Sequence, residues 1–205
     1  MNATTQRGEI AGPAGALAVA VDTRADVAQR GLAMICHPHP LHGGTMDNKV
    51  VQTVARALLQ IGWRTVRFNF RGVAGSGGAW DEGRGEVDDA LAVIAAHRAA
   101  GERLVLGGFS FGGYVAAAAA ARLARPDAPE RLVLVGPATA SFPVPPVPPG
   151  TLVIHGEQDE VVPLSATLDW ARPQVLPVVV VPGVGHFFHG QLGVLKSLVL
   201  RNFAE

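Results

Sequence analysis

A Gly-x-Ser-x-Gly sequence joins an apolar run to an alanine-rich run near the middle of this 205-residue chain. Residues 103–107 are typical of a short buried strand, and the alanines at 116–121 favour a helix. Gly108-Phe109-Ser110-Phe111-Gly112 lies between them. Glycines beside a sharp strand-to-helix turn let the backbone pass close by, so the hydroxyl of Ser110 would stand clear of the sheet. This predicts an exposed nucleophile, whereas the alternative is a turn that only caps the helix.

Composition favours a single domain with a large core over residues 1–205. Hydrophobic residues make up 48% and charged residues 17%, against a usual charged share of about 25%. The 17 basic residues balance the 17 acidic ones, which argues against nucleic acid or an anionic membrane as a partner. Cys36 is the only cysteine, so an internal disulfide is excluded. Since no apolar run approaches the roughly 20 residues of a membrane span, we expect a cytoplasmic protein.

Apolar strands alternate with helices along the chain. After a hairpin at residues 9–22, strands are predicted over 31–36, 64–70, 103–107, 131–135, 151–155 and 175–181, and helices over 48–61, 86–100, the segment after Ser110, 165–171 and 191–203. This alternation predicts an α/β fold whose mostly parallel central sheet has helices on both faces. The link at 136–150 is rich in proline and short, so we expect no lid domain.

An acid and a base for Ser110 are expected in the loops after the strands, because ligands gather beyond the carboxyl ends of parallel strands. Asp159 lies four residues past strand 151–155, and His186 follows strand 175–181. The chain order Ser110, Asp159, His186 suits this architecture. A serine hydroxyl needs a neutral imidazole to take its proton, and a carboxylate to fix the tautomer of that imidazole.

Two of these predicted roles have rivals nearby in the sequence. Glu157 and Glu160 flank Asp159, and either is a candidate acid or a solvated loop carboxylate. His189 competes with His186, although we expect His189 to start or cap the last helix. The residue types and their positions relative to the strands favour Asp159 as the acid and His186 as the base.

An oxyanion formed at Ser110 needs two backbone N–H donors. One is Phe111, the residue after the nucleophile. The other is expected in the loop after strand 31–36, where Pro38 and Pro40 have no N–H to donate. His39 is the first choice there, and Leu41 is the alternative.

Several segments, taken together, resemble the α/β-hydrolase superfamily, and within it a group of small lidless bacterial serine esterases loosely related to dienelactone hydrolases. The matching segments are residues 36–38, 43–51, 67–73, 108–113, 155–163 and 186–189. The resemblance implies triad roles for Ser110, Asp159 and His186, and an oxyanion role for the loop around His39. Two positions depart from the pattern. Ala74 stands where the family often has glycine, and dienelactone hydrolases proper have a cysteine in place of Ser110.

The expected activity is that of a carboxylesterase-type serine hydrolase. It would cleave small carboxylic esters through an acyl-enzyme intermediate, with no cofactor and no metal. Thioesters and amides are alternative substrates for the same triad. Leu41, Phe187, Phe188 and Arg71 are the candidate substrate-binding residues. Arg71 would bind a substrate carboxylate or anchor its loop, and the two phenylalanines would line an acyl pocket or simply pack.

Two other classes of function compete with this prediction. His37, His39 and His42 have the offsets of some metallo-hydrolase loops, but Leu41 stands where such loops usually carry a carboxylate. A metal-dependent hydrolase would also leave Ser110 and its partners without a purpose. The other class is a hydrolase fold used only for binding, and the complete set of three triad residue types argues against it.

Overall fold

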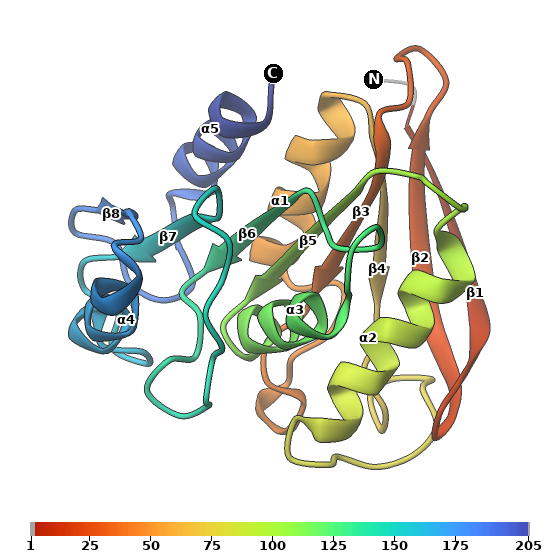
Figure 1. The fold of residues 1–205 in the computed structure, drawn as a ribbon, viewed down its shortest axis with the longest axis horizontal. Coiled ribbons are helices and arrows are strands. Elements are labelled where there is room, and N and C mark those ends of the chain that lie inside the picture. Colours follow the sequence, from red (N-terminus) through yellow and green to blue (C-terminus); the bar gives the residue numbers. More distant parts are fainter. Residues whose placement is uncertain (1–2, 205) are drawn as a thin grey trace.

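A computed structural model describes residues 3–204 of the chain. They form one eight-stranded sheet flanked by helices (Figure 1). The strands are β1 (Ala3–Gly12), β2 (Gly15–Arg24), β3 (Gly31–Cys36), β4 (Trp63–Phe68), β5 (Leu104–Phe109), β6 (Arg131–Val135), β7 (Leu152–Gly156) and β8 (Val178–Val181). The helices are α1 (Lys49–Gln60), α2 (Arg84–His97), α3 (Phe111–Arg122), α4 (Leu164–Ala171) and α5 (Leu192–Phe203), with short 3-10 turns η1 (Pro40–His42) and η2 (Arg172–Gln174).

The strand order explains where a site forms. The order is β1-β2-β4-β3-β5-β6-β7-β8, with β1, β2 and β4 paired antiparallel in turn, and parallel pairing from β4 through β3 to β8. The predicted mostly parallel sheet is therefore confirmed. From β3 the chain moves to β4 on one side and then crosses to β5 on the other. Ligands bind at such a switch point, because the loops leaving the two strands diverge there.

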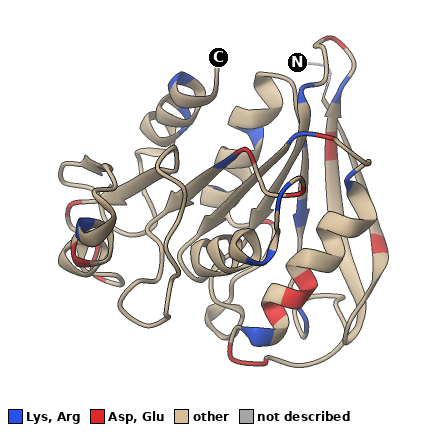
Figure 2. Cartoon of the chain, in the orientation of Figure 1, with Lys and Arg blue, Asp and Glu red and all other residues tan. Residues whose placement is uncertain are grey.

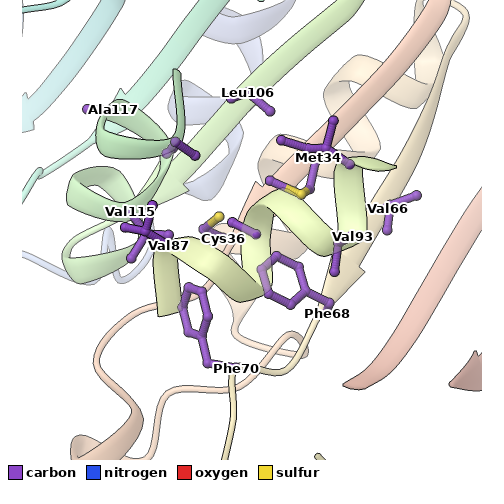
Figure 3. Packing of buried hydrophobic residues seen from close by; sticks show 14 of the residues in the cluster. Met34, Cys36, Val66, Phe68, Phe70, Val87, Val93, Leu106, Val115 and Ala117 are labelled. Atoms are coloured by element: carbon purple, nitrogen blue, oxygen red, sulfur yellow. The ribbon is translucent and has the colours of Figure 1, made fainter. Parts of the chain in front are cut away.

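Helices cover both faces of the sheet, as the sequence predicts. On one face α2 and α3 pack over strand side chains such as Met34 and Phe68. Figure 3 shows Phe68 of β4 near Val93 of α2, and Val115 of α3 beside Val87 of α2. On the other face α1 and α5 pack over residues such as Ile35. The neighbours Met34 and Ile35 serve opposite faces, because side chains alternate along a strand. Both layers are apolar, so the central strands β3, β5 and β7 are buried between them, whereas the edge strand β1 is mostly exposed.

Element boundaries differ from the predicted ones where side chains or backbone geometry intervene. The strand predicted over 64–70 ends at Phe68, because Asn69 turns away to accept from Met46 N–H and to donate to Ala74 O. The strand predicted over 175–181 begins at Val178, because Val175 has left-handed backbone, with φ 51°.

The link between β6 and β7 contains neither a helix nor a strand. Its Phe142 packs on Phe111 and Tyr114, with ring centroids 5.0 and 5.1 Å apart, so this part of the link lies against α3. The expectation of a fold without a lid domain is confirmed. Basic and acidic residues are interspersed over the chain (Figure 2). Among the helices within residues 3–204, none combines the length and the apolar character needed to cross a membrane.

Candidate active site

A cavity of about 200 Å³ contains two of the three predicted triad residues. The loops after β3, β5, β7 and β8 supply its lining, so it lies at the carboxyl edge of the parallel strands. The lining residues are Pro38, His39, His42, Gly43, Gly44, Asn48, Ser110, Val161, His186 and Phe187.

Ser110 occupies the sharp turn between β5 and α3. Its φ is 56° and its ψ is −120°, a strained conformation for a residue with a side chain. The Ser110 N–H donates to Val135 O at 2.9 Å, which ties the turn to β6. A Cβ at Gly108 would clash with Gly112 O, and one at Gly112 would clash with Cys36 O. Both glycines of the motif are therefore required by close backbone packing.

Asp159 and His186 form a buried hydrogen-bonded pair. His186 Nδ1 lies 2.7 Å from Asp159 Oδ2. Asp159 Oδ1 accepts from the N–H groups of Val161 and Val162, at 2.9 and 2.7 Å. Burial by itself raises the pKa of Asp159, but these hydrogen bonds outweigh it and hold the pKa below the ordinary value. An ionised Asp159 can only accept, so Nδ1 of His186 carries the proton and Nε2 is left as the basic nitrogen.

Two further details describe the space around this pair. Gly136 has a φ of 47°, and a Cβ there would lie 3.3 Å from Asp159 Oδ2 and 3.4 Å from His186 Cε1. Glycine therefore leaves the carboxylate and the imidazole unobstructed. The hydrogen bonds within residues 3–204 do not include one between Ser110 and His186. Such bonds are often long in a site without substrate and tighten when substrate binds.

The rival residues lie outside the cavity. Glu157 is exposed and accepts from Gly183 N–H at 2.8 Å. Glu160 is also exposed, as is His189. None of the three lines the cavity. The geometry thus favours Asp159 over its two acidic neighbours, and His186 over His189.

Sequence reasoning missed the position of His155, directly behind the candidate acid. This histidine is fully buried, with Nε2 at 2.9 Å from Val162 O and 3.4 Å from Asp159 Oδ2. Burial lowers the pKa of His155, so the ring is neutral near neutral pH. Asn48, His42 and Val161 also line the cavity, a position that the sequence did not predict for them, although Val161 lies only two residues past Asp159.

The predicted oxyanion donors lie on the two sides of the switch point. Phe111 is the first residue of α3, so its N–H has no acceptor in a preceding turn. In the β3 loop, the Leu41 N–H donates to His39 Nδ1 at 3.3 Å. No hydrogen bond among residues 3–204 uses the His39 N–H. Leu41 is 66% exposed and absent from the lining, which favours His39 as the second donor.

His37 joins the β3 loop to the loop after β4. Its Nδ1 donates to Pro38 O at 2.6 Å, and its Nε2 accepts from Phe70 N–H at 3.1 Å. Burial lowers the pKa of His37 to about 4, against the opposing effect of the Pro38 bond. Both ring nitrogens are used, so none is left for a metal. No three His, Cys, Asp or Glu side chains in the described chain are placed to hold a metal ion. The geometry therefore does not support the metal site considered for His37, His39 and His42.

Three of the four predicted substrate-binding residues do not line the cavity. Arg71 pairs with the fully buried Asp89 of α2, at 2.7 Å between Nη2 and Oδ1, so it anchors its loop. Phe188 is fully buried in the core on the α1 and α5 face and is absent from the lining. Leu41 projects into solvent. The geometry therefore does not favour substrate binding by these three residues, whereas Phe187 does line the cavity.

The chain is similar to known proteins over almost its whole length. The sequence model of the alpha/beta hydrolase fold family matches residues 41–150. An α/β serine hydrolase without a lid from Xanthomonas campestris is 40% identical, with a TM-score of 0.88 over 97% of this chain and 93% of that one. An α/β serine hydrolase homologue from Coxiella burnetii is 39% identical, with a TM-score of 0.84 over 97% of each chain.

A curated relative matches part of the sequence. An uncharacterised protein of Rickettsia prowazekii is 38% identical over an alignment of 141 residues that covers 64% of this chain and 58% of that protein. The chain therefore spans little more than half the length of this relative.

Proposed function

Because this chain belongs to the α/β-hydrolase family, we propose that it cleaves short carboxylic esters as a serine hydrolase. The observation that carries the proposal is the buried pair of Asp159 and His186, in which His186 Nδ1 lies 2.7 Å from Asp159 Oδ2. His186 lines the same small cavity as Ser110.

The reaction has two halves. Ser110 Oγ attacks the ester carbon while His186 Nε2 takes its proton, and Asp159 stabilises the imidazolium. The N–H groups of Phe111 and His39 bind the oxyanion. His186 then gives its proton to the departing alcohol, which leaves the acyl group on Ser110. Water attacks this acyl-enzyme with His186 again as base, so the products are one alcohol, one carboxylic acid and free enzyme.

The cavity favours uncharged substrates. No Lys, Arg, Asp or Glu is among its lining residues. Arg71, the cation predicted nearby, is already neutralised by Asp89. A carboxylate on the substrate would therefore lose hydration without gaining an ion pair. The volume of about 200 Å³ suits a small ester.

Hydrolysis of p-nitrophenyl butyrate by the wild type and by Ser110→Ala tests the proposal. We expect the substitution to lower kcat by a factor on the order of 10⁴ or more, because the nucleophile is lost. The far-ultraviolet circular dichroism should stay unchanged, and EDTA should leave the wild-type rate unchanged. A Ser110→Ala variant with wild-type turnover, or a rate that EDTA abolishes and zinc restores, would contradict the proposal.

A further inference from the structure

The lining of the cavity is chemically divided. Val161 and Phe187 give it an apolar side, and both follow triad residues closely in the chain. Segment 42–48 of the β3 loop supplies a polar side through His42, Gly43, Gly44 and Asn48. A substrate that fills the cavity therefore meets different chemistry at its two ends.

Asn48 has one defined orientation on the polar side. Its Oδ1 accepts from the N–H groups of Val50 and Val51, at 2.9 and 3.4 Å, and so caps α1. Because both partners are N–H donors, the amide oxygen must face the helix. The Nδ2 group therefore points away from the helix, and no hydrogen bond within residues 3–204 uses it. A half-buried amide with two available donors thus borders the cavity.

The direction of the reaction decides which part of the substrate meets Asn48, and this step rests on the proposed function. His186 must give its proton to the departing alcohol, so the alcohol lies beside His186. The ring of Phe187 packs against His186, with centroids 5.1 Å apart, which places the alcohol on the apolar side. The acyl chain then extends the other way, toward segment 42–48.

We propose that Asn48 Nδ2 donates a hydrogen bond to an oxygen on the acyl chain. The preferred substrates are thus short esters that carry a neutral acceptor, such as an ether, hydroxyl or keto oxygen, in the acyl part and an apolar alcohol. A carboxylate is disfavoured, because the lining offers it no cation. The N–H groups of Val50 and Val51 at the start of α1 are no substitute, since both already donate to Asn48 Oδ1.

The test compares two isosteric esters, p-nitrophenyl 3-methoxypropanoate and p-nitrophenyl pentanoate, in which an ether oxygen replaces one CH₂. The key variant is Asn48→Asp, which keeps the size and the capping oxygen but loses both amide donors. We expect the ratio of kcat/KM for the ether ester to that for the pentanoate to fall about fivefold to tenfold. Gln52→Glu adds the same charge one turn along α1, outside the lining, and should leave this ratio unchanged.

The outcomes separate the two proposals. An unchanged ratio in Asn48→Asp, with both esters hydrolysed by the wild type, overturns the role of Asn48 and leaves the esterase proposal intact. An equal fall of the ratio in Gln52→Glu also overturns it, because the effect would then come from charge alone. If the wild type hydrolyses neither ester and no other ester tried, the proposed function itself fails. Thermal unfolding of each variant confirms that the fold is kept.

Discussion

At the scale of single residues, the proposed chemistry depends on the tautomer of His186. The ionised Asp159 accepts three hydrogen bonds: one from His186 at Oδ2, and two from backbone N–H groups at Oδ1. This arrangement fixes the carboxylate and keeps the proton of His186 on Nδ1. A free Nε2 can then act as the base toward Ser110.

Histidine substitutions test this assignment directly. His186→Ala should lower kcat about 10³-fold or more, because no group remains to take the proton from Ser110. His189→Ala is the matched control, since His189 is exposed three residues away and lies outside the cavity. We expect its kcat to stay within about threefold of the wild type, on the general rule that distant surface changes are mild. A larger loss in His189→Ala than in His186→Ala would move the base to His189.

The sequence located the candidate triad residues better than it located the lining of the cavity. Ser110, Asp159 and His186 follow strand ends, and strand ends can be located from apolar runs. Side-chain direction requires backbone angles and tertiary partners. The φ of 53° at Phe188 and the pairing of Arg71 with Asp89 involve contacts that no local pattern encodes.

At the scale of elements, His37 is the link that holds two loops of the site in register. It bonds to Pro38 O in the β3 loop and to Phe70 N–H in the loop after β4. The neutral ring is required, because protonation at Nε2 would remove the acceptor for Phe70. The loop that presents His39 therefore depends on an uncharged His37.

Acid should destabilise the fold through His37. The pKa of this ring is about 4 in the folded chain and about 6.5 when unfolded. Between these values the unfolded chain binds more protons, so stability is full above about pH 6.5 and falls as pH decreases. Between pH 7.5 and 5 the loss from His37 should be about 2 kcal/mol.

Urea unfolding across this pH range measures the effect in the wild type and in His37→Gln. In the variant, residue 37 has no group that titrates. The number of protons taken up on unfolding, which sets the slope of the free energy of unfolding against pH, should therefore be smaller by about one. The lowered pKa values of His39, His97 and His155 act in the same direction. They are present in both proteins and cancel in the comparison. Identical pH slopes would refute this account of His37.

Elements with regular patterns could be predicted to within two residues. The helix predicted over 48–61 forms from Lys49 to Gln60 with Asn48 as its cap. The strand over 131–135 matches β6. The helix predicted over 86–100 instead begins at Arg84, because the Glu86 carboxylate accepts from the N–H of the capping Gly83, and it ends at His97. That bond places Glu86 in the first turn and Asp89 beyond it.

At the scale of the whole molecule, the site is open because the β6–β7 link makes no lid. Alternation of strands and helices predicted the α/β sheet, but it does not specify that β3 lies between β4 and β5. That order follows from long-range pairing, and it brings the β3 loop beside Ser110.

An open, small site should favour short acyl chains. Each CH₂ that becomes buried contributes about 0.8 kcal/mol, but a cavity of about 200 Å³ accepts few of them. We expect kcat/KM for p-nitrophenyl alkanoates to peak at roughly two to six carbons. No jump in rate should occur when substrate exceeds its solubility, since no lid has to open. A maximum at about twelve carbons, or interfacial activation, would show that the site has another cover.

Covalent labelling with a fluorophosphonate tests the central claim most directly, because the reagent reacts only with a serine made nucleophilic by its surroundings. After labelling and proteolysis, mass spectrometry locates the adduct. We predict one phosphonyl group per chain, on Ser110, with labelling abolished in Ser110→Ala and slowed at least about a hundredfold in His186→Ala. A folded wild-type protein that takes up no label, or that takes it up on a residue other than Ser110, would contradict the account.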